Sequence, residues 1–163
     1  MSSERTEVIL TNARLVLGDR VLESGWVAVS GGKIVEFGEG DAPGGGEDVK
    51  GDLVMPGLIE LHTDHLEAHY VPRPKVFWDP VAAVVSYDGQ LATSGITTVL
   101  DSLRVWREEG AEDVDGQAGI LAEAISAARD ANLLRAQHFL HLRCEIPMPS
   151  VVEEAKELVG RPD

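Results

Sequence analysis

The residues best suited to chemistry lie at the end of an apolar run over residues 53–65. His62 and Asp64 stand two positions apart, and side chains two apart in a strand project from the same face. The apolar run that leads to them predicts a buried strand. An imidazole and a carboxylate placed together at the C-terminal end of a strand indicate a divalent metal site.

Two later strands, predicted over residues 96–100 and 136–146, also end in ionisable side chains. These side chains are Asp101, Arg104, His141, Arg143 and Glu145. Sites in parallel α/β folds gather at the C-terminal ends of strands. We therefore expect the three strand ends to face one point, with Glu145 as a candidate third ligand.

Each of these residues also has a plainer interpretation. Glu145 could form a surface ion pair with Arg143 instead of binding a metal, and Asp101 could orient a neighbouring side chain. Arg73 and Arg104 could clamp a phosphorylated substrate, since a planar guanidinium matches phosphate oxygens. They could equally be ordinary surface arginines, and spacing alone leaves these alternatives open.

The elements that come first in the chain predict a small β module. Residues 6–38 are rich in strand-forming residues, which indicates short antiparallel strands. Three predicted turns separate these strands, at Gly18-Asp19, Ser24-Gly25 and Ser30-Gly31-Gly32. The glycine-rich stretch over residues 38–51 predicts a loop. We take this loop as the boundary between a β module of residues 1–52 and a second part, residues 53–163.

From residue 53 onward, strands alternate with helices. Asp79-Pro80 predicts the start of a helix, because aspartate suits the N-cap and proline the first helical position, and Ser94-Gly95 predicts its end. Another helix is predicted over 114–131, and Ser150 and Glu153 form a capping box that opens a last one. The order β-α-β-α-β-α indicates an α/β fold with parallel strands. It fits a small open domain or the first three units of a (β/α)8 barrel.

The bulk properties exclude several classes of partner. The chain has 163 residues, 44% of them hydrophobic, and a net charge of −14. Such an acidic surface repels phosphate backbones and anionic lipids, so we predict no nucleic-acid or membrane binding. No apolar run approaches the ~20 residues needed to span a bilayer, and residues 1–7 carry no apolar signal segment. With one cysteine, an intrachain disulfide is excluded, and we predict a cytoplasmic protein.

Longer strings of residues resemble one protein family. They are Met55-Pro-Gly-Leu-Ile-Glu-Leu-His62, His62-Thr-Asp-His-Leu-Glu-Ala-His69, Pro72-Arg-Pro74, Gly95-Ile-Thr-Thr-Val99, Asp101-Ser-Leu-Arg104 and His138-Phe-Leu-His-Leu-Arg-Cys-Glu145. Together with the preceding β module, they resemble the amidohydrolase superfamily of metal-dependent hydrolases, and in particular its phosphonate-metabolism branch. Most members of the superfamily carry His-x-His where this chain has His62-Thr-Asp64.

The resemblance implies a fold and a reaction. The fold would be a distorted (β/α)8 barrel beside a small β-sandwich, of which this chain would hold three βα units and half of the sandwich. The reaction would be hydrolysis of α-D-ribose 1-methylphosphonate 5-triphosphate to the 5-phosphate and diphosphate. By analogy, His62 and Asp64 would bind one divalent metal ion and Glu145 would contact or bridge the metals. One or two ions of Zn²⁺, Mn²⁺ or Fe²⁺ suit these donors.

Members of this family run to well over twice the length of this chain. Their later strands supply further histidine ligands and an aspartate that handles the proton of the attacking water. We therefore expect the chain to be the N-terminal part of a longer protein and to be inactive alone. Its partner would be a small phosphorylated substrate, and homo-oligomerisation is left open. Two alternatives stand beside this function, namely a superfamily hydrolase acting on a C–N bond and a non-catalytic binding subunit.

Overall fold

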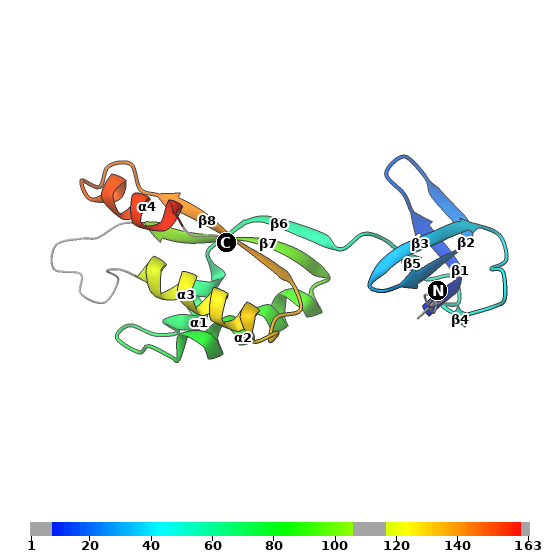
Figure 1. The fold of residues 1–163 in the computed structure, drawn as a ribbon, viewed down its shortest axis with the longest axis horizontal. Coiled ribbons are helices and arrows are strands. Elements are labelled where there is room, and N and C mark those ends of the chain that lie inside the picture. The colour runs from blue at the N-terminus through cyan, green and yellow to red at the C-terminus, as the bar shows by residue number, and fades with distance from the viewer. Residues whose placement is uncertain (1–7, 106–116, 161–163) are drawn as a thin grey trace, which may run out of the picture. The chain divides into compact units, whose positions relative to one another are not determined.

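The chain divides into two compact units, residues 1–56 and 57–163. The computed structural model describes residues 8–105 and 117–160, and Figure 1 shows its elements. Residues 53–56, which the predicted boundary assigned to the second part, lie in the first unit. Positions 114–116 of the predicted helix 114–131 lie outside the described residues.

The first unit is a five-stranded sheet with the strand order β3-β2-β1-β4, in which β5 also pairs with β1. Its strands are β1 (Val8–Val16), β2 (Val21–Ser30), β3 (Lys33–Glu39), β4 (Glu47–Asp48) and β5 (Leu53–Val54). The antiparallel pairing predicted for this region is confirmed for β1, β2 and β3, whereas β4 and β5 run parallel to β1. The sheet is therefore mixed.

Of the turns predicted at Ser24-Gly25 and Ser30-Gly31-Gly32, only the second is present. Gly31 and Gly32 have positive φ angles of 58° and 72° and form the predicted hairpin turn between β2 and β3. The predicted break at Ser24-Gly25 is wrong, because β2 continues through both residues. A β-carbon at Gly25 would approach the carbonyl oxygen of Gly38 to 2.8 Å. Gly25 thus fits close packing and not a turn.

The second unit is built on a parallel sheet with the strand order β6-β7-β8, as the alternation of strands and helices predicts. Its elements are β6 (Leu58–Thr63), α1 (His65–Tyr70), α2 (Pro80–Thr93), β7 (Ile96–Val105), α3 (Gln117–Asp130), β8 (Gln137–Cys144) and α4 (Val151–Val159). The short helix α1 is not among the predicted helices. β7 is also five residues longer than predicted, so Asp101 and Arg104 lie inside a strand.

Helix α2 begins and ends where its capping residues predict. Helix α4 begins after Ser150 as predicted, but without the predicted cap. The Oδ1 atom of Asp79 accepts a hydrogen bond from the N–H of Ala82 at 2.8 Å, and Gly95 follows the helix with a φ of 78°. Ser150 precedes α4, but its side chain makes no cap hydrogen bond, so the predicted capping box is wrong. The backbone of Ser150 is helical, with φ −83° and ψ −9°. An N-cap residue needs a non-helical backbone to aim its side chain at the first turn.

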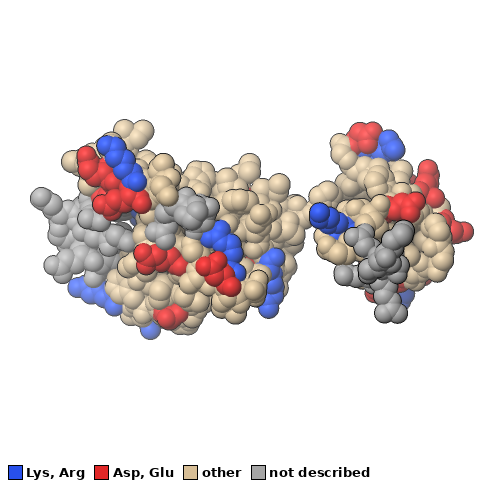
Figure 2. Space-filling model, viewed as in Figure 1, with Lys and Arg blue, Asp and Glu red and all other residues tan. Residues whose placement is uncertain are grey.

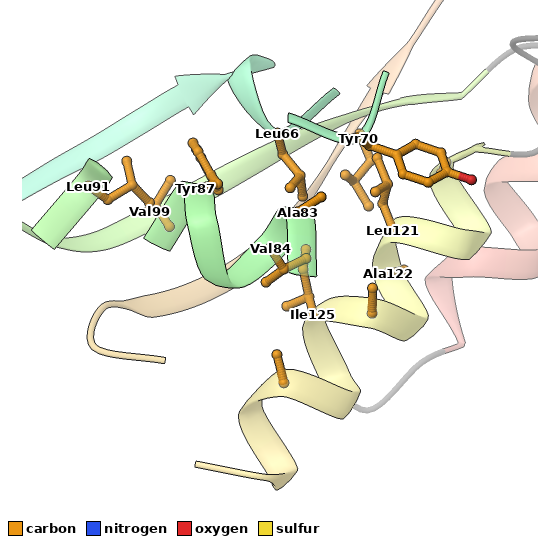
Figure 3. Packing of buried hydrophobic residues seen from close by; sticks show 14 residues of the cluster. Leu66, Tyr70, Ala83, Val84, Tyr87, Leu91, Val99, Leu121, Ala122 and Ile125 are labelled. Atoms are coloured by element: carbon orange, nitrogen blue, oxygen red, sulfur yellow. The ribbon is translucent and has the colours of Figure 1, made fainter. Parts of the chain in front are cut away.

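The core of the second unit lies between its helices and one face of the sheet. Figure 3 shows Val84 of α2 and Ile125 of α3 packed against each other, and Val99 and Leu103 of β7 belong to the same buried cluster. Leu158 of α4 packs against this cluster as well. Among the described residues, no helix is long and apolar enough to cross a bilayer.

Strand β6 departs from its prediction as a buried strand. Leu58, Ile59 and Leu61 are 50%, 61% and 65% exposed. In the part of the chain that the structure describes, β6 pairs only with β7 and is therefore an edge strand. Burial of such a strand requires cover on both faces of the sheet, which parallel sheets normally have. Here the core cluster joins the described helices to one face of the sheet, and we call the other face the open face.

Close packing between β6 and β7 begins at Gly57. A β-carbon at this position would overlap the side chain of Thr97 in β7. Gly57 directly precedes β6, and the N–H of Leu58 donates a hydrogen bond to the carbonyl of Gly95 at 2.9 Å. The glycine therefore lets the two backbones meet at the start of the parallel ladder.

Asp88 connects α2 to the start of β8. Its carboxylate is fully buried and accepts hydrogen bonds from the backbone N–H groups of Arg135 and Ala136 at 3.0 and 2.8 Å. It also lies 3.3 Å from Nε2 of His138. A helical residue thus holds the two residues that lead into the third parallel strand.

Replacing Asp88 with alanine should destabilise the second unit by about 3 kcal/mol. The buried N–H of Ala136, the partly buried N–H of Arg135 and one ring nitrogen would lose their acceptor, and such groups are costly to leave unpaired. Urea unfolding followed by far-UV circular dichroism would measure the change. Asp19→Ala is the control, because Asp19 is exposed and pairs only with its neighbour Arg20; its effect should stay within about 0.5 kcal/mol. A loss below about 1 kcal/mol for Asp88→Ala would contradict this account.

Candidate functional site

The strand register separates the polar residues of β7 and β8 onto the two faces of the sheet. Val99 and Leu103 face the helices, and the alternation of side chains places Asp101 with them. Ser102 and Arg104 lie on the open face. The register partner of Ser102 is His141, and that of Arg104 is Arg143. The open face therefore carries two successive rows of polar side chains towards the C-terminal ends of these strands.

His62 and Asp64 contact residues of the open face. The ring centroid of His62 lies 5.0 Å from that of His141, with the two rings nearly perpendicular at 87°. The Oδ2 atom of Asp64 accepts a hydrogen bond from Nη1 of Arg143 at 3.0 Å. The register between β6 and β7 shifts between Glu60 and Thr63. The predicted pair thus lies beside residues of β8, two strands away.

Arg143 pairs with both carboxylates that the sequence suggests as metal ligands, Asp64 and Glu145. Its Nη2 atom lies 2.9 Å from Oε1 of Glu145, while its Nη1 atom bonds Asp64. The pairing with Glu145 is the ion pair that the sequence leaves open as the alternative to metal binding. All three side chains are partly exposed, which weakens each contact by solvent screening. Their arrangement places a guanidinium between two carboxylates.

Arg104 pairs with Glu67 of α1. Its Nη2 atom lies 3.2 Å from Oε2 of Glu67. Burial raises the pKa of Glu67 above its usual value, although the positive charge of Arg104 acts in the opposite direction. Arg104 and Arg143 also line one cavity of about 310 Å³, together with Glu145, Pro147 and Met148.

Arg73 is not brought to this cavity. It lies between α1 and α2, is exposed, and forms an isolated backbone bridge with Val76. Of the two arginines predicted to bind substrate, the structure therefore places Arg104 beside the other open-face residues and Arg73 elsewhere on the second unit.

The described residues do not complete a metal site. His62, Asp64 and Glu145 offer nitrogen and oxygen donors that suit Zn²⁺, Mn²⁺ or Fe²⁺. Across residues 8–105 and 117–160, however, no three His, Cys, Asp or Glu side chains form a group that could hold a metal ion. Arg143 also contacts both carboxylates. These three residues remain candidate ligands.

A buried histidine between two carboxylates lies on the opposite, helix-facing side of the sheet. Nδ1 of His138 is 2.8 Å from Oδ2 of Asp101, and its Nε2 is 3.3 Å from Oδ1 of Asp88. All three side chains are almost fully buried. Each ring nitrogen thus lies within hydrogen-bond distance of a carboxylate oxygen, and this arrangement favours the imidazolium, the form in which both nitrogens donate. Asp101 therefore orients a neighbouring side chain, which is the alternative that the sequence leaves open for it.

The pKa values in this triad follow from its contacts. Burial lowers the pKa of His138, but hydrogen bonds and charge from Asp101 and Asp88 outweigh burial and raise it above the usual value. Burial raises the pKa of Asp88, but hydrogen bonds from Ala136, Arg135 and His138 hold it below the usual value. Both shifts favour the charged forms.

Sequence reasoning missed the roles of His138 and Asp88, and for Arg143 it foresaw the pairing with Glu145 but not the one with Asp64. A signal existed for Arg143, because Ser102-x-Arg104 and His141-x-Arg143 repeat the same polar spacing at the ends of adjacent strands. For Asp88 no local signal exists, since its partners lie 47 to 50 residues away in the chain.

The chain has a curated relative. It is 37% identical over 155 residues to a protein of Escherichia coli (strain K12) named alpha-D-ribose 1-methylphosphonate 5-triphosphate diphosphatase. The match covers 94% of this chain and 41% of the relative, so the chain spans less than half of that protein's length. No model of a known protein family matches the sequence.

Solved structures share the fold at low sequence identity. A triazine hydrolase from Arthobacter aurescens matches with a TM-score of 0.56 and 17% identity, over 98% of this chain and 44% of the other. An N-acetyl-D-glucosamine-6-phosphate deacetylase from Mycobacterium smegmatis matches with a TM-score of 0.55 and 18% identity, over 85% and 36%. Both belong to the amidohydrolase superfamily. At these sequence identities the matches are evidence for the fold alone.

The buried triad should make the stability of the second unit depend on pH. The raised pKa of His138 adds stability that is fully present below its unfolded value of about 6.5 and is lost as the pH rises through the folded value. The lowered pKa of Asp88 adds stability that is present above about 3.9 and is lost as the pH falls through its folded value. We expect the triad to stabilise most between these limits.

Urea unfolding at a series of pH values would test this dependence. His138→Gln removes the titrating group, so the fall in stability between about pH 6.5 and higher pH should flatten. His65→Gln is a matched control, because His65 is exposed and its ring forms no ion pair among the described residues. An unchanged pH profile for His138→Gln would show that the triad does not carry the charge assigned to it.

Proposed function

We propose that this chain, a homologue of the alpha-D-ribose 1-methylphosphonate 5-triphosphate diphosphatase of Escherichia coli, belongs to a metal-dependent hydrolase that acts on the same substrate. The products would be the 5-phosphate and diphosphate. The observation that carries this proposal is the 37% identity, which extends over 94% of the chain. The activity is proposed for a protein that includes the regions of the relative beyond this match.

The open face of the second unit supports chemistry on a phosphorylated molecule. Hydrolysis of a phosphoric anhydride breaks a P–O bond with water as the nucleophile and diphosphate as the leaving group. Negative charge develops on the phosphoryl oxygens and on the leaving group, and fixed positive charges stabilise it. Arg104 lies at the C-terminal end of β7 and lines a cavity there. We propose Arg104, and more peripherally Arg73, as substrate-binding residues.

We further propose that β6, β7 and β8 are the first three strands of a (β/α)8 barrel. Members of the amidohydrolase superfamily typically bind metal ions, and His62, Asp64 and Glu145 are the ligands that this chain would contribute. Because the described residues do not complete such a site, we expect the chain to be inactive without further strands.

The two rival functions have less support. Two structural neighbours are named as a triazine hydrolase and a deacetylase. Their sequence identities of 17% and 18% support a shared fold but not a shared substrate. No contact of the described residues favours a purely binding role over a catalytic one. The relative at 37% identity is a diphosphatase by name, which favours the phosphoric anhydride.

A chimaera would test the proposed function. Residues 1–163 would replace the matched region of the Escherichia coli relative, and diphosphate release from α-D-ribose 1-methylphosphonate 5-triphosphate would be followed by ³¹P NMR with added Zn²⁺, Mn²⁺ or Fe²⁺. We expect the chimaera to release diphosphate and the 163-residue chain alone not to. His62→Ala and Glu145→Ala in the chimaera should lower the rate by at least roughly a hundredfold if these residues bind metal.

Metal content gives an independent measurement on the same variants. Both substitutions should lower the bound metal of the chimaera, whereas His65→Ala, in an exposed neighbour of the site, should not. A folded chimaera that loads metal but leaves the triphosphate intact would refute the proposed reaction. Unchanged metal content in both variants would refute the assigned ligands.

A further inference from the structure

Two arginines stand side by side on the open face. Arg104 of β7 and Arg143 of β8 are register partners in a parallel ladder, and adjacent strands lie ~4.8 Å apart. Like charges on directly opposite residues of adjacent strands are unfavourable for a sheet. Both arginines line the cavity of about 310 Å³. This volume lies at the lower end of the range for small-molecule sites, ~300–1,000 Å³.

Three carboxylates hold the two guanidinium groups in place. Glu67 pairs with Arg104 at 3.2 Å, and Asp64 and Glu145 pair with Arg143 at 3.0 and 2.9 Å. Each of the two carboxylates on Arg143 contacts a different terminal nitrogen. A guanidinium has five N–H groups, so these two pairs leave three N–H groups of Arg143 for another acceptor.

In the row of side chains next to the arginines, two polar atoms have no hydrogen-bond partner among the described residues. Ser102 is 1% exposed, and its hydroxyl has no hydrogen-bond partner within the described ranges. The same holds for Nδ1 of its register partner His141. Buried polar atoms are normally paired, and unpaired ones indicate a missing ligand or water. Ser102 and His141 lie two residues before the arginines and on the same face.

We infer that Arg104 and Arg143 form a binding site for a polyphosphate group, with the carboxylates of Glu67, Asp64 and Glu145 holding the guanidiniums in position until the anion arrives. A guanidinium binds two phosphate oxygens through parallel N–H groups, and this geometry is stronger than a single contact to a partly exposed carboxylate. The identity of the polyphosphate as the triphosphate of the substrate rests on the proposed function. The site itself rests on the two arginines and their cavity.

Calorimetric titration of the 163-residue chain with sodium triphosphate would test this site. The buffer would contain EDTA and little salt, so that no divalent metal bridges the anion and screening stays weak. We expect Arg104→Met and Arg143→Met each to weaken binding by roughly tenfold or more. Arg20→Met is the matched control, because Arg20 is an exposed arginine of the first unit paired with its neighbour Asp19, and it should bind like the unmodified chain.

A second set of variants separates anion binding from a structural role of the arginines. Arg143→Lys keeps the positive charge but loses the planar set of N–H donors. Its affinity for triphosphate should therefore lie between those of the unmodified chain and Arg143→Met. Glu145→Gln removes one competing carboxylate and should tighten binding, which a merely structural ion pair would not do. Circular dichroism would show that each variant is folded.

The inference is overturned if the unmodified chain does not bind triphosphate, if both arginine-to-methionine variants bind as well as it does, or if Arg20→Met loses as much affinity. Its failure is distinguishable from that of the proposed function. The chain could bind triphosphate through both arginines while the chimaera does not hydrolyse the substrate. This result would support the binding site and contradict only the proposed reaction.

Discussion

The second unit depends on a histidine held between two carboxylates inside the protein. Asp88 comes from α2, Asp101 from β7 and His138 from β8, so a single cluster connects a helix to two strands. Burying three ionisable groups is costly, and removing one of them leaves charges without a partner. The cluster is balanced because each ring nitrogen of His138 has a carboxylate partner, while Asp88 accepts two further hydrogen bonds from backbone N–H groups. This arrangement fixes where β8 begins relative to β7.

That position has a direct effect on the open face of the sheet. In a parallel ladder, a shift of β8 by one residue would turn every one of its side chains to the other face. His138 and His141 are three residues apart and therefore lie on opposite faces. The same strand thus carries one histidine that holds the fold and another that lies in the candidate site. The register set by His138 is what brings Arg143 beside Arg104 and His141 beside Ser102.

The elements that could be predicted are those with local causes. Asp79-Pro80 and Ser94-Gly95 mark the ends of α2 because capping and backbone geometry act within one turn of a helix. The prediction that His62 and Asp64 share one strand holds only for His62, because β6 ends at Thr63 and Asp64 precedes α1 with φ −105° and ψ 13°. The pairing of Asp64 with Arg143 has no such cause, since 79 residues separate them. Such contacts follow from the assembled sheet and cannot be derived from neighbouring residues.

The wrong predictions also have physical reasons. β6 was expected to be buried because its apolar residues suit a core, but burial depends on what covers a strand, and that information lies outside the strand. Asp101 was grouped with Arg104 as a strand-end residue because β7 was predicted too short. Within the longer strand, their separation of three residues places them on opposite faces. One provides a buried support and the other a candidate binding group.

The contact of Gly57 with Thr97 limits how this part of the protein can change in evolution. A β-carbon at position 57 would overlap the β-carbon of Thr97 as well as its outer atoms. Replacement of Thr97 by alanine would therefore not make room, and glycine would be required there first. Substitutions at the two positions therefore depend on their order, and related sequences should show glycine at one position whenever the other carries a side chain.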